Sequence, residues 1–244
     1  MSKPNLNKFA IPTDFDEGFP VMDSHHGKGE TRVYLREIKA ALLEHIANAE
    51  VVIGCVAWLT DFDILRALAG KRVVSILIQK EDFLRPDSAE HKNFHADLRV
   101  AYSRLPEFER APMPSLVSEL STNGDGSSEA IRCVGFSNAH GPFRPRLHHK
   151  FCLFGRFVPG RDRPGFREDM IGSMWDAEYV DTYAAWTGSF NWTSSASHSL
   201  ENAIYTVDEL VVQNLTKEWA NCFALSERLD WSSTYVEPEY RLGT

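Results

Sequence analysis

The sequence predicts a single α/β domain, because apolar runs of strand length alternate with segments of helical periodicity and no clean break divides them. The clearest group is an apolar run at 51–58, a short helical segment starting near Asp61 or Asp63, and a second apolar run at 73–78. Two strands joined through a helix form a βαβ unit, which implies parallel pairing with a right-handed crossover. The 244 residues are 43% hydrophobic and 25% charged, which is an ordinary globular composition.

The segments around this unit follow from the same signals. Residues 1–30 are polar and rich in proline and glycine, so they predict an irregular N-terminal segment. Apolar residues at helical spacing from Leu35 to Ile46 predict a helix with Thr31 as its N-cap. Gly70 is expected to end the short helix of the βαβ unit.

The downstream half continues the alternation of helices and strands. Residues 86–103 predict a polar helix, with Tyr102 closing into a strand, and residues 104–129 predict a flexible loop because they combine prolines with a Ser/Gly-rich tract. Apolar runs predict strands at 131–136, 150–157 and 183–189. A long helix with one apolar side is expected at about 208–228.

Several classes of protein are disfavoured by composition. No apolar run approaches the roughly 18–20 residues that a membrane span needs, so we expect no membrane association. The first residues lack the apolar stretch of a secretory signal. Cys55, Cys133, Cys152 and Cys222 show no CxxC spacing, which predicts reduced, mostly buried thiols in a cytoplasmic protein.

The formal net charge is −8, yet basic residues concentrate between 141 and 167. This stretch holds Arg144, Arg146, Lys150, Arg156, Arg161, Arg163 and Arg167, opposed by a single acid. A solvated loop explains such a run. An anion site explains it as well, because Arg and Lys are the usual partners of phosphate.

Chemistry-bearing residues begin at the predicted strand that follows 147. His148 and Lys150 lie two positions apart, so on a strand they share one face while His149 points to the other. A histidine beside a lysine is unfavourable in an apolar core and suits a place where an anion binds.

Two further groups come later in the chain. Ser189 and Asn191 are again two positions apart and can converge on one object, and Gly188 permits close backbone approach. Glu201 follows ten residues beyond Asn191.

These three groups together resemble the phospholipase D superfamily, whose signature is His-x-Lys, four residues, Asp, and later Gly-Ser-x-Asn. The matching residues are His148, Lys150, Gly188, Ser189, Asn191 and, downstream, Glu201. The stretch GSFNWTSSASHSLENAIYTV looks especially like the single-motif bacterial endonucleases of the family. The resemblance implies one phospholipase D-like domain over 1–244, with a mixed, mostly parallel sheet and helices on both faces.

Two departures from the family pattern stand out. The position of the family Asp holds Gly155, and this puts catalytic efficiency in question. The gap from His148 to Gly188 is longer than in compact members, so residues 158–180 are expected to form an insertion between the two motif strands.

The resemblance implies a metal-independent phosphodiesterase in which neutral His148 attacks phosphorus and forms a covalent phosphohistidine. Lys150, Ser189 and Asn191 would bind the phosphate oxygens, and Glu201 would orient His148. Because the chain carries one motif, a homodimer would supply the second histidine as general acid. Neither a cofactor nor a metal is expected.

DNA is the expected substrate, with RNA as an alternative. The candidate substrate contacts are Arg144, Arg146, His149, Arg156, Arg161, Arg163, Gly188 and Trp192. By analogy with bacterial nucleases of this type, we also expect a partner protein such as an ATPase that directs the enzyme to its target, and a role in bacterial defence. Two other functions stay open: a phosphate-binding or nucleic-acid-binding module whose site is eroded at Gly155, and a lipid phosphodiesterase.

Overall fold

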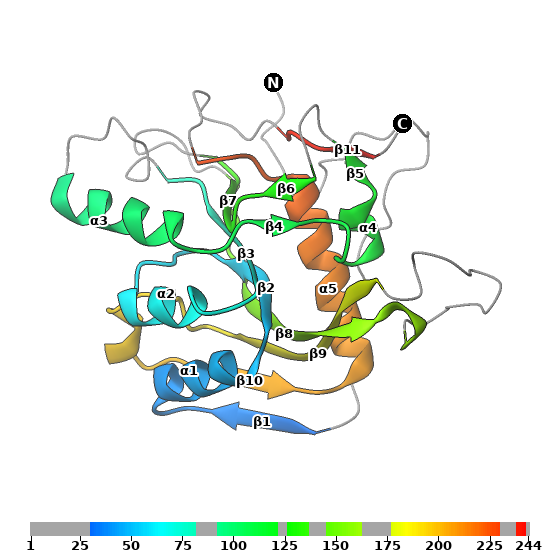
Figure 1. The fold of residues 1–244 in the computed structure, drawn as a ribbon. Helices are drawn as coiled ribbons and strands as arrows, with labels where there is room; N and C mark the ends of the chain where they lie inside the picture. The colour runs from blue at the N-terminus through cyan, green and yellow to red at the C-terminus, as the bar shows by residue number, and fades with distance from the viewer. Residues whose placement is uncertain are drawn as a thin grey trace.

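The structure is a computed structural model that describes residues 30–81, 92–121, 126–136, 145–162, 177–229 and 238–242. Its centre is a seven-stranded sheet with the strand order β1-β10-β9-β8-β2-β3-β7 (Figure 1). The strands are β1 (Thr31–Tyr34), β2 (Val51–Val56), β3 (Val73–Gln79), β7 (Ile131–Val134), β8 (Lys150–Pro159), β9 (Glu178–Gly188) and β10 (Ala203–Thr206).

The sheet is mixed, as expected, but parallel pairing is the minority. β2 pairs parallel with β3 and β3 with β7, whereas the pairs β2–β8, β8–β9, β9–β10 and β10–β1 are antiparallel. The expectation of a mostly parallel sheet is therefore corrected. The reason is connectivity, since a parallel pair needs a long crossover: β2 leads to β3 through α2, and β3 leads to β7 through α3.

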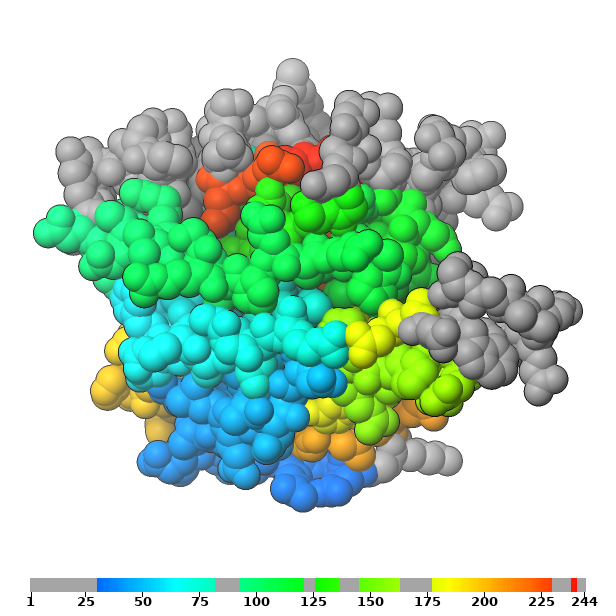
Figure 2. Space-filling view, in the orientation of Figure 1, coloured from blue at the N-terminus to red at the C-terminus, as the bar shows by residue number. Residues whose placement is uncertain are grey.

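Helices cover both faces of the sheet, as predicted. On one face lie α1 (Ile38–Asn48), α2 (Phe62–Leu68) and α3 (Lys92–Ser103), which Figure 2 shows side by side across the surface. On the other face lie α4 (Ser115–Ser118) and the long helix α5 (Glu209–Ala224). Every residue of β2 and β3 is buried, which explains why these strands read as continuous apolar runs.

The predicted βαβ unit is confirmed, and Asp61 rather than Asp63 caps its helix. Asp61 Oδ1 accepts hydrogen bonds from the backbone N–H groups of Asp63 (2.9 Å) and Ile64 (3.2 Å). Its other carboxylate oxygen lies 2.7 Å from Lys39 Nζ on α1. The same aspartate therefore starts α2 and joins it to α1.

The predicted start of the first helix is wrong. Thr31 lies in the edge strand β1 and pairs with Thr206 of β10, while α1 begins only after Glu37, whose φ is 52°. The predicted strand at Tyr102 is also wrong, because Tyr102 is a buried residue of α3 whose hydroxyl donates to the carbonyl of Leu59. Both differences come from contacts between distant parts of the chain.

The region 104–129 contains regular structure where a flexible loop was expected. Its described residues include α4 and the short strands β4 (Phe108–Glu109), β5 (Leu120–Ser121) and β6 (Ser127–Ser128). Phe108, Met113, Val117 and Leu120 are buried in the core beneath α5, and β5 pairs with β11 (Arg241–Leu242). The apolar residues scattered among the prolines thus anchor this segment.

Strands β8 and β9 continue into the segment 158–180, which was expected to be an insertion. Their last paired residues there are Pro159 and Glu178. A single 3-10 turn (Gly160–Asp162) follows β8, and residues 163–176 lie outside the described ranges. Within the described ranges, we find no helix with the length and apolar character needed to cross a membrane.

Candidate active site

The His-x-Lys segment lies at the carboxyl ends of the parallel strands β2 and β3. The backbone N–H of Ala57, just after β2, donates to the carbonyl of His149 (2.9 Å). The backbone N–H of Leu147 donates to Oε1 of Gln79, a buried residue at the end of β3 (2.7 Å). Carboxyl ends of strands are where open α/β sheets bind their ligands.

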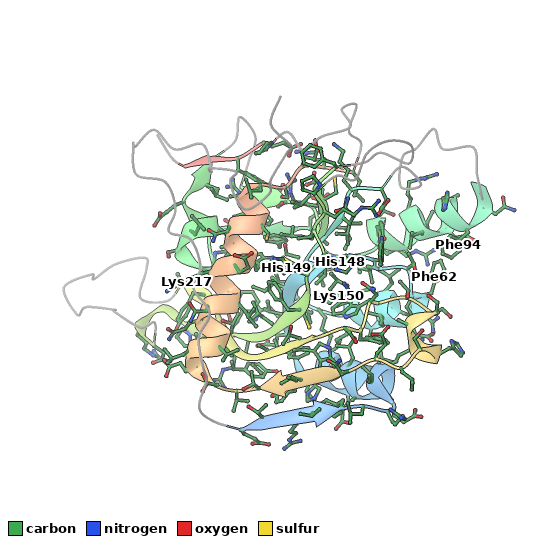
Figure 3. The ribbon with its side chains drawn as sticks, turned by 180° about the vertical axis from the view of Figure 1, so that it is seen from behind. Phe62, Phe94, His148, His149, Lys150 and Lys217 are labelled. Atoms are coloured by element: carbon green, nitrogen blue, oxygen red, sulfur yellow. The ribbon has the colours of Figure 1, made fainter. Side chains whose placement is uncertain are left out.

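His148 and Lys150 point to the same face, and His149 points to the opposite one, as the strand alternation predicts (Figure 3). Lys150 Nζ lies 3.3 Å from Nε2 and 3.4 Å from Nδ1 of His148, and it donates to the carbonyl of His148 (3.0 Å). The Trp58 ring meets the imidazole edge-on at 5.8 Å. An exposed imidazole is thus flanked by an ammonium group and an indole.

The charges around His148 favour its neutral form. Partial burial, followed by the positive charges of Lys150 and Arg146, holds the pKa of His148 below its usual value. Burial also lowers the pKa of Lys150, while the negative charge of Glu201 acts in the opposite direction. A neutral imidazole keeps one ring nitrogen free as a nucleophile.

Ser189 and Glu201 form a hydrogen-bonded pair. The Ser189 hydroxyl donates to Glu201 Oε2 and accepts from the backbone N–H of Asn202 (3.0 Å). This pair lies beside the His-x-Lys segment, because β9, which ends just before Ser189, pairs Thr187 with Phe151 of β8. Glu201 was expected to orient His148, but the structure gives it Ser189 as its hydrogen-bond partner.

Asn191 lies in a turn that is fixed to the segment after β2. The backbone N–H of Trp192 donates to the carbonyl of Trp58 (3.0 Å), and that of Thr60 donates to the carbonyl of Trp192 (2.8 Å). The Asn191 side-chain oxygen is buried and accepts no hydrogen bond from the part of the chain that the structure describes. Buried polar atoms are nearly always paired, so this amide oxygen is available to a hydrogen-bond donor.

Two candidate substrate contacts serve the fold instead. A Cβ on Gly188 would lie 2.7 Å from Cα of Ala203, so glycine is needed for the close approach of β10 rather than of a substrate. The Trp192 side chain is only 1% exposed and packs in the core, so it offers no contact surface.

The candidate arginines do not all gather at this site. Arg146 is near His148 and pairs with Glu81 (3.2 Å). Arg156 pairs with Asp181 (3.3 Å) and lies six residues along β8 from Lys150, roughly 20 Å away at strand spacing, and Arg161 lies beyond the end of β8. Arg156 and Arg161 therefore lie away from His148, and their role as substrate contacts stays a prediction. Arg144 and Arg163 lie outside the described residues.

Gly155 also lies far along β8 from the candidate site. It pairs with Val51 at the opposite end of β2 from the segment that follows Val56. A Cβ at this position would lie 3.1 Å from the carbonyl of Asp181 and 3.2 Å from the side chain of Val51. The family Asp position is therefore a packing position between neighbouring strands of this chain.

Trp58 and Glu81 are two site residues that the sequence reasoning missed. Trp58 contacts both His148 and Lys150, and its indole N–H donates to Glu81 (3.2 Å), which also pairs with Arg146. The available signal was their place just after β2 and β3, where sites in α/β sheets form.

On the opposite face, His149, Glu218 and Cys222 form a cluster that could hold a metal ion.

Comparisons with known proteins give low but extended similarity. No model of a known protein family matches the sequence. An uncharacterised protein of Acanthamoeba polyphaga mimivirus is 28% identical over 216 residues, which cover 83% of this chain and 68% of that protein.

Among solved structures, NucT from Helicobacter pylori has a TM-score of 0.48 and 13% identity, covering 81% of this chain and 97% of that one. Nuc from Salmonella typhimurium, described as a phospholipase D family member, has a TM-score of 0.45 and 16% identity, with the same coverage.

Proposed function

We propose that this chain is a phosphodiesterase of the phospholipase D type that cleaves nucleic acid, DNA foremost, without a metal ion in the catalytic step. The observation that carries the proposal is the contact of the Lys150 ammonium with both ring nitrogens of an exposed, neutral-biased His148. A lysine there binds a phosphate oxygen and keeps the imidazole unprotonated. The Ser189–Glu201 pair and Asn191 border the same place.

In the proposed reaction, a ring nitrogen of His148 attacks the phosphorus of a phosphodiester. The N–P bond forms, the bond from phosphorus to the leaving oxygen breaks, and a general acid protonates that oxygen to give an alcohol. Water then attacks the phosphohistidine, gives its proton to the same acid–base group, and releases a phosphate monoester. The Lys150 ammonium and the Asn191 amide N–H donate to the non-bridging oxygens and stabilise their charge, and the Ser189 hydroxyl does so once its proton turns from Glu201 to the substrate.

The general acid is proposed to be His148 of a second copy of the chain across a twofold axis. Within the described residues there is one His-x-Lys motif, His148 to Lys150, and the second histidine is therefore proposed to come from a second copy of the chain. Leu200, next to Glu201, is 86% exposed, and such an apolar side chain at the rim of the site suits burial between two copies.

Phosphate contacts carry no sequence information, so the proposed enzyme has no intrinsic sequence preference. Direction to a target by a partner protein such as an ATPase, and a role in defence against foreign DNA, belong to the same proposal. Lipid cleavage, or phosphate binding without turnover, would be revealed by the same experiment.

The test is incubation of the purified chain with supercoiled plasmid, single-stranded DNA, RNA and phosphatidylcholine in excess EDTA. We expect the wild type to cleave DNA and His148→Ala to be inactive. His198→Ala is the matched control, because His198 is another exposed histidine, and it should cleave like the wild type. Cleavage that requires a divalent metal and persists in His148→Ala would overturn the proposal.

The dimeric site is tested by mixing subunits. When wild-type and His148→Ala chains are refolded together in equal amounts, random pairing leaves about one quarter of the dimers with two histidines. Activity per total chain should therefore fall to about one quarter of the wild-type value. A fall to only about one half would mean that each chain acts alone.

A further inference from the structure

A second cluster of reactive side chains lies on the face of the sheet opposite His148. His149 Nε2 is 3.1 Å from Glu218 Oε1, and Cys222 Sγ is 3.7 Å from the same oxygen. The three ligand atoms all lie within 4.8 Å of one another. His149 comes from the segment just before β8, and Glu218 and Cys222 come from the second half of α5.

The local structure fixes this convergence. Glu218 and Cys222 are four residues apart on α5, so they lie one above the other on the same helix face. His149 reaches the same place because strand alternation turns it away from His148 and toward α5 (Figure 3). Cys222 is buried, Glu218 is half-buried and His149 is exposed, so the cluster runs from the core to solvent.

Two of the three separations are close to those of ligands around a tetrahedral zinc ion. Zinc lies about 2.3 Å from a Cys sulfur and about 2.0–2.2 Å from His nitrogen and carboxylate oxygen, which places neighbouring ligand atoms roughly 3.2–3.7 Å apart. The His149–Glu218 and Glu218–Cys222 separations, 3.1 and 3.7 Å, lie close to that range, and the His149 and Cys222 ligand atoms lie within 4.8 Å of each other. The exposed side of His149 leaves room for water as a fourth ligand.

We propose that His149, Glu218 and Cys222 bind one zinc ion on the face opposite the phosphodiesterase site. The mixed nitrogen, oxygen and sulfur ligands favour zinc over magnesium or calcium, which prefer oxygen alone. Zinc there bonds α5 to the residue that precedes Lys150 and so stabilises the His-x-Lys segment from behind. The ion takes no part in phosphoryl transfer, and this inference goes beyond the proposed function.

The test uses the full chain, purified in reduced form and freed of metal, and titrated with cobalt(II) as a spectroscopic substitute for zinc. We expect one equivalent of cobalt to give the visible bands of tetrahedral cobalt together with the near-ultraviolet band of a cobalt–thiolate bond. Zinc should abolish both bands by displacement and raise the melting temperature of the wild type.

Two variants locate the site. Cys222→Ser should lose the thiolate band, and Glu218→Gln, which keeps the side-chain shape at a half-buried position, should lose tight binding while still folding. Cys133→Ser is the matched control, because Cys133 is another buried free cysteine and lies on β7. It should bind cobalt like the wild type.

The inference is overturned if the reduced wild type gives no cobalt bands, or if Glu218→Gln binds as well as the wild type. The cluster would then be a hydrogen-bonded His–Glu pair beside a thiol. Because the readout is metal binding, its failure is distinguishable from failure of nuclease activity.

Discussion

Replacing Lys150 by methionine should raise the pKa of His148. The Lys150 ammonium lies 3.3 Å from the nearer ring nitrogen of His148, and its charge disfavours the imidazolium form. Two unit charges at this distance repel by about 1.3 kcal/mol even in the dielectric of bulk water, which is the screened limit suited to exposed groups. Removing the lysine charge should therefore move the His148 titration midpoint up by about one pH unit.

The assay is a nuclear magnetic resonance titration of the histidine ring protons, in which the His148→Ala spectrum identifies the His148 signal. Arg146→Met is the matched comparison: it removes a second nearby cation, but Arg146 is paired with Glu81, so the midpoint should rise less. A midpoint that stays constant or falls in Lys150→Met would refute the electrostatic argument. It would also remove the reason for a neutral His148 nucleophile.

Three further substitutions test the fold around the site. Asp61→Ala removes the N-cap of α2 and should lower the free energy of unfolding by about 1–2 kcal/mol, seen as a lower midpoint of urea denaturation. An unchanged midpoint would contradict the capping role. Gly155→Asp introduces the Asp of the phospholipase D signature but crowds the carbonyl of Asp181, so the melting temperature should fall with no gain in DNA cleavage. Higher activity would be the contrary result. Gly188→Ala should lower the free energy of unfolding by about 1–3 kcal/mol, measured by thermal denaturation. Gly70→Ala is the control and should be tolerated, because its new Cβ meets nothing nearer than 3.8 Å. Equal losses of stability in the two variants would contradict the packing argument.

The sequence predicts the buried centre of the fold well and its edges poorly. β2 and β3 are covered on both faces, so their apolar runs identify them directly. β1 carries no such signal, because it is a mostly exposed edge strand that pairs with β10, about 170 residues away. Phe108 and Val117 are anchored by α5, and this contact is equally invisible in local composition.

The same division applies to the candidate site. The opposite orientation of His148 and His149 follows from strand alternation, and the sequence predicts it. Which groups meet them depends on tertiary packing: Trp58 contacts His148, and Glu218 on α5 contacts His149. The position of Arg156 follows from strand length, since six residues of β8 separate it from Lys150.

The most direct test of the central claim is to capture the covalent intermediate on His148. The protein is mixed with a slowly cleaved phosphodiester, quenched in alkali to preserve phosphohistidine, digested, and analysed by mass spectrometry. The account predicts one adduct, located by fragmentation on His148 and not on the adjacent His149, and absent from His148→Ala. Cleavage without any adduct, or an adduct on another residue, would contradict it.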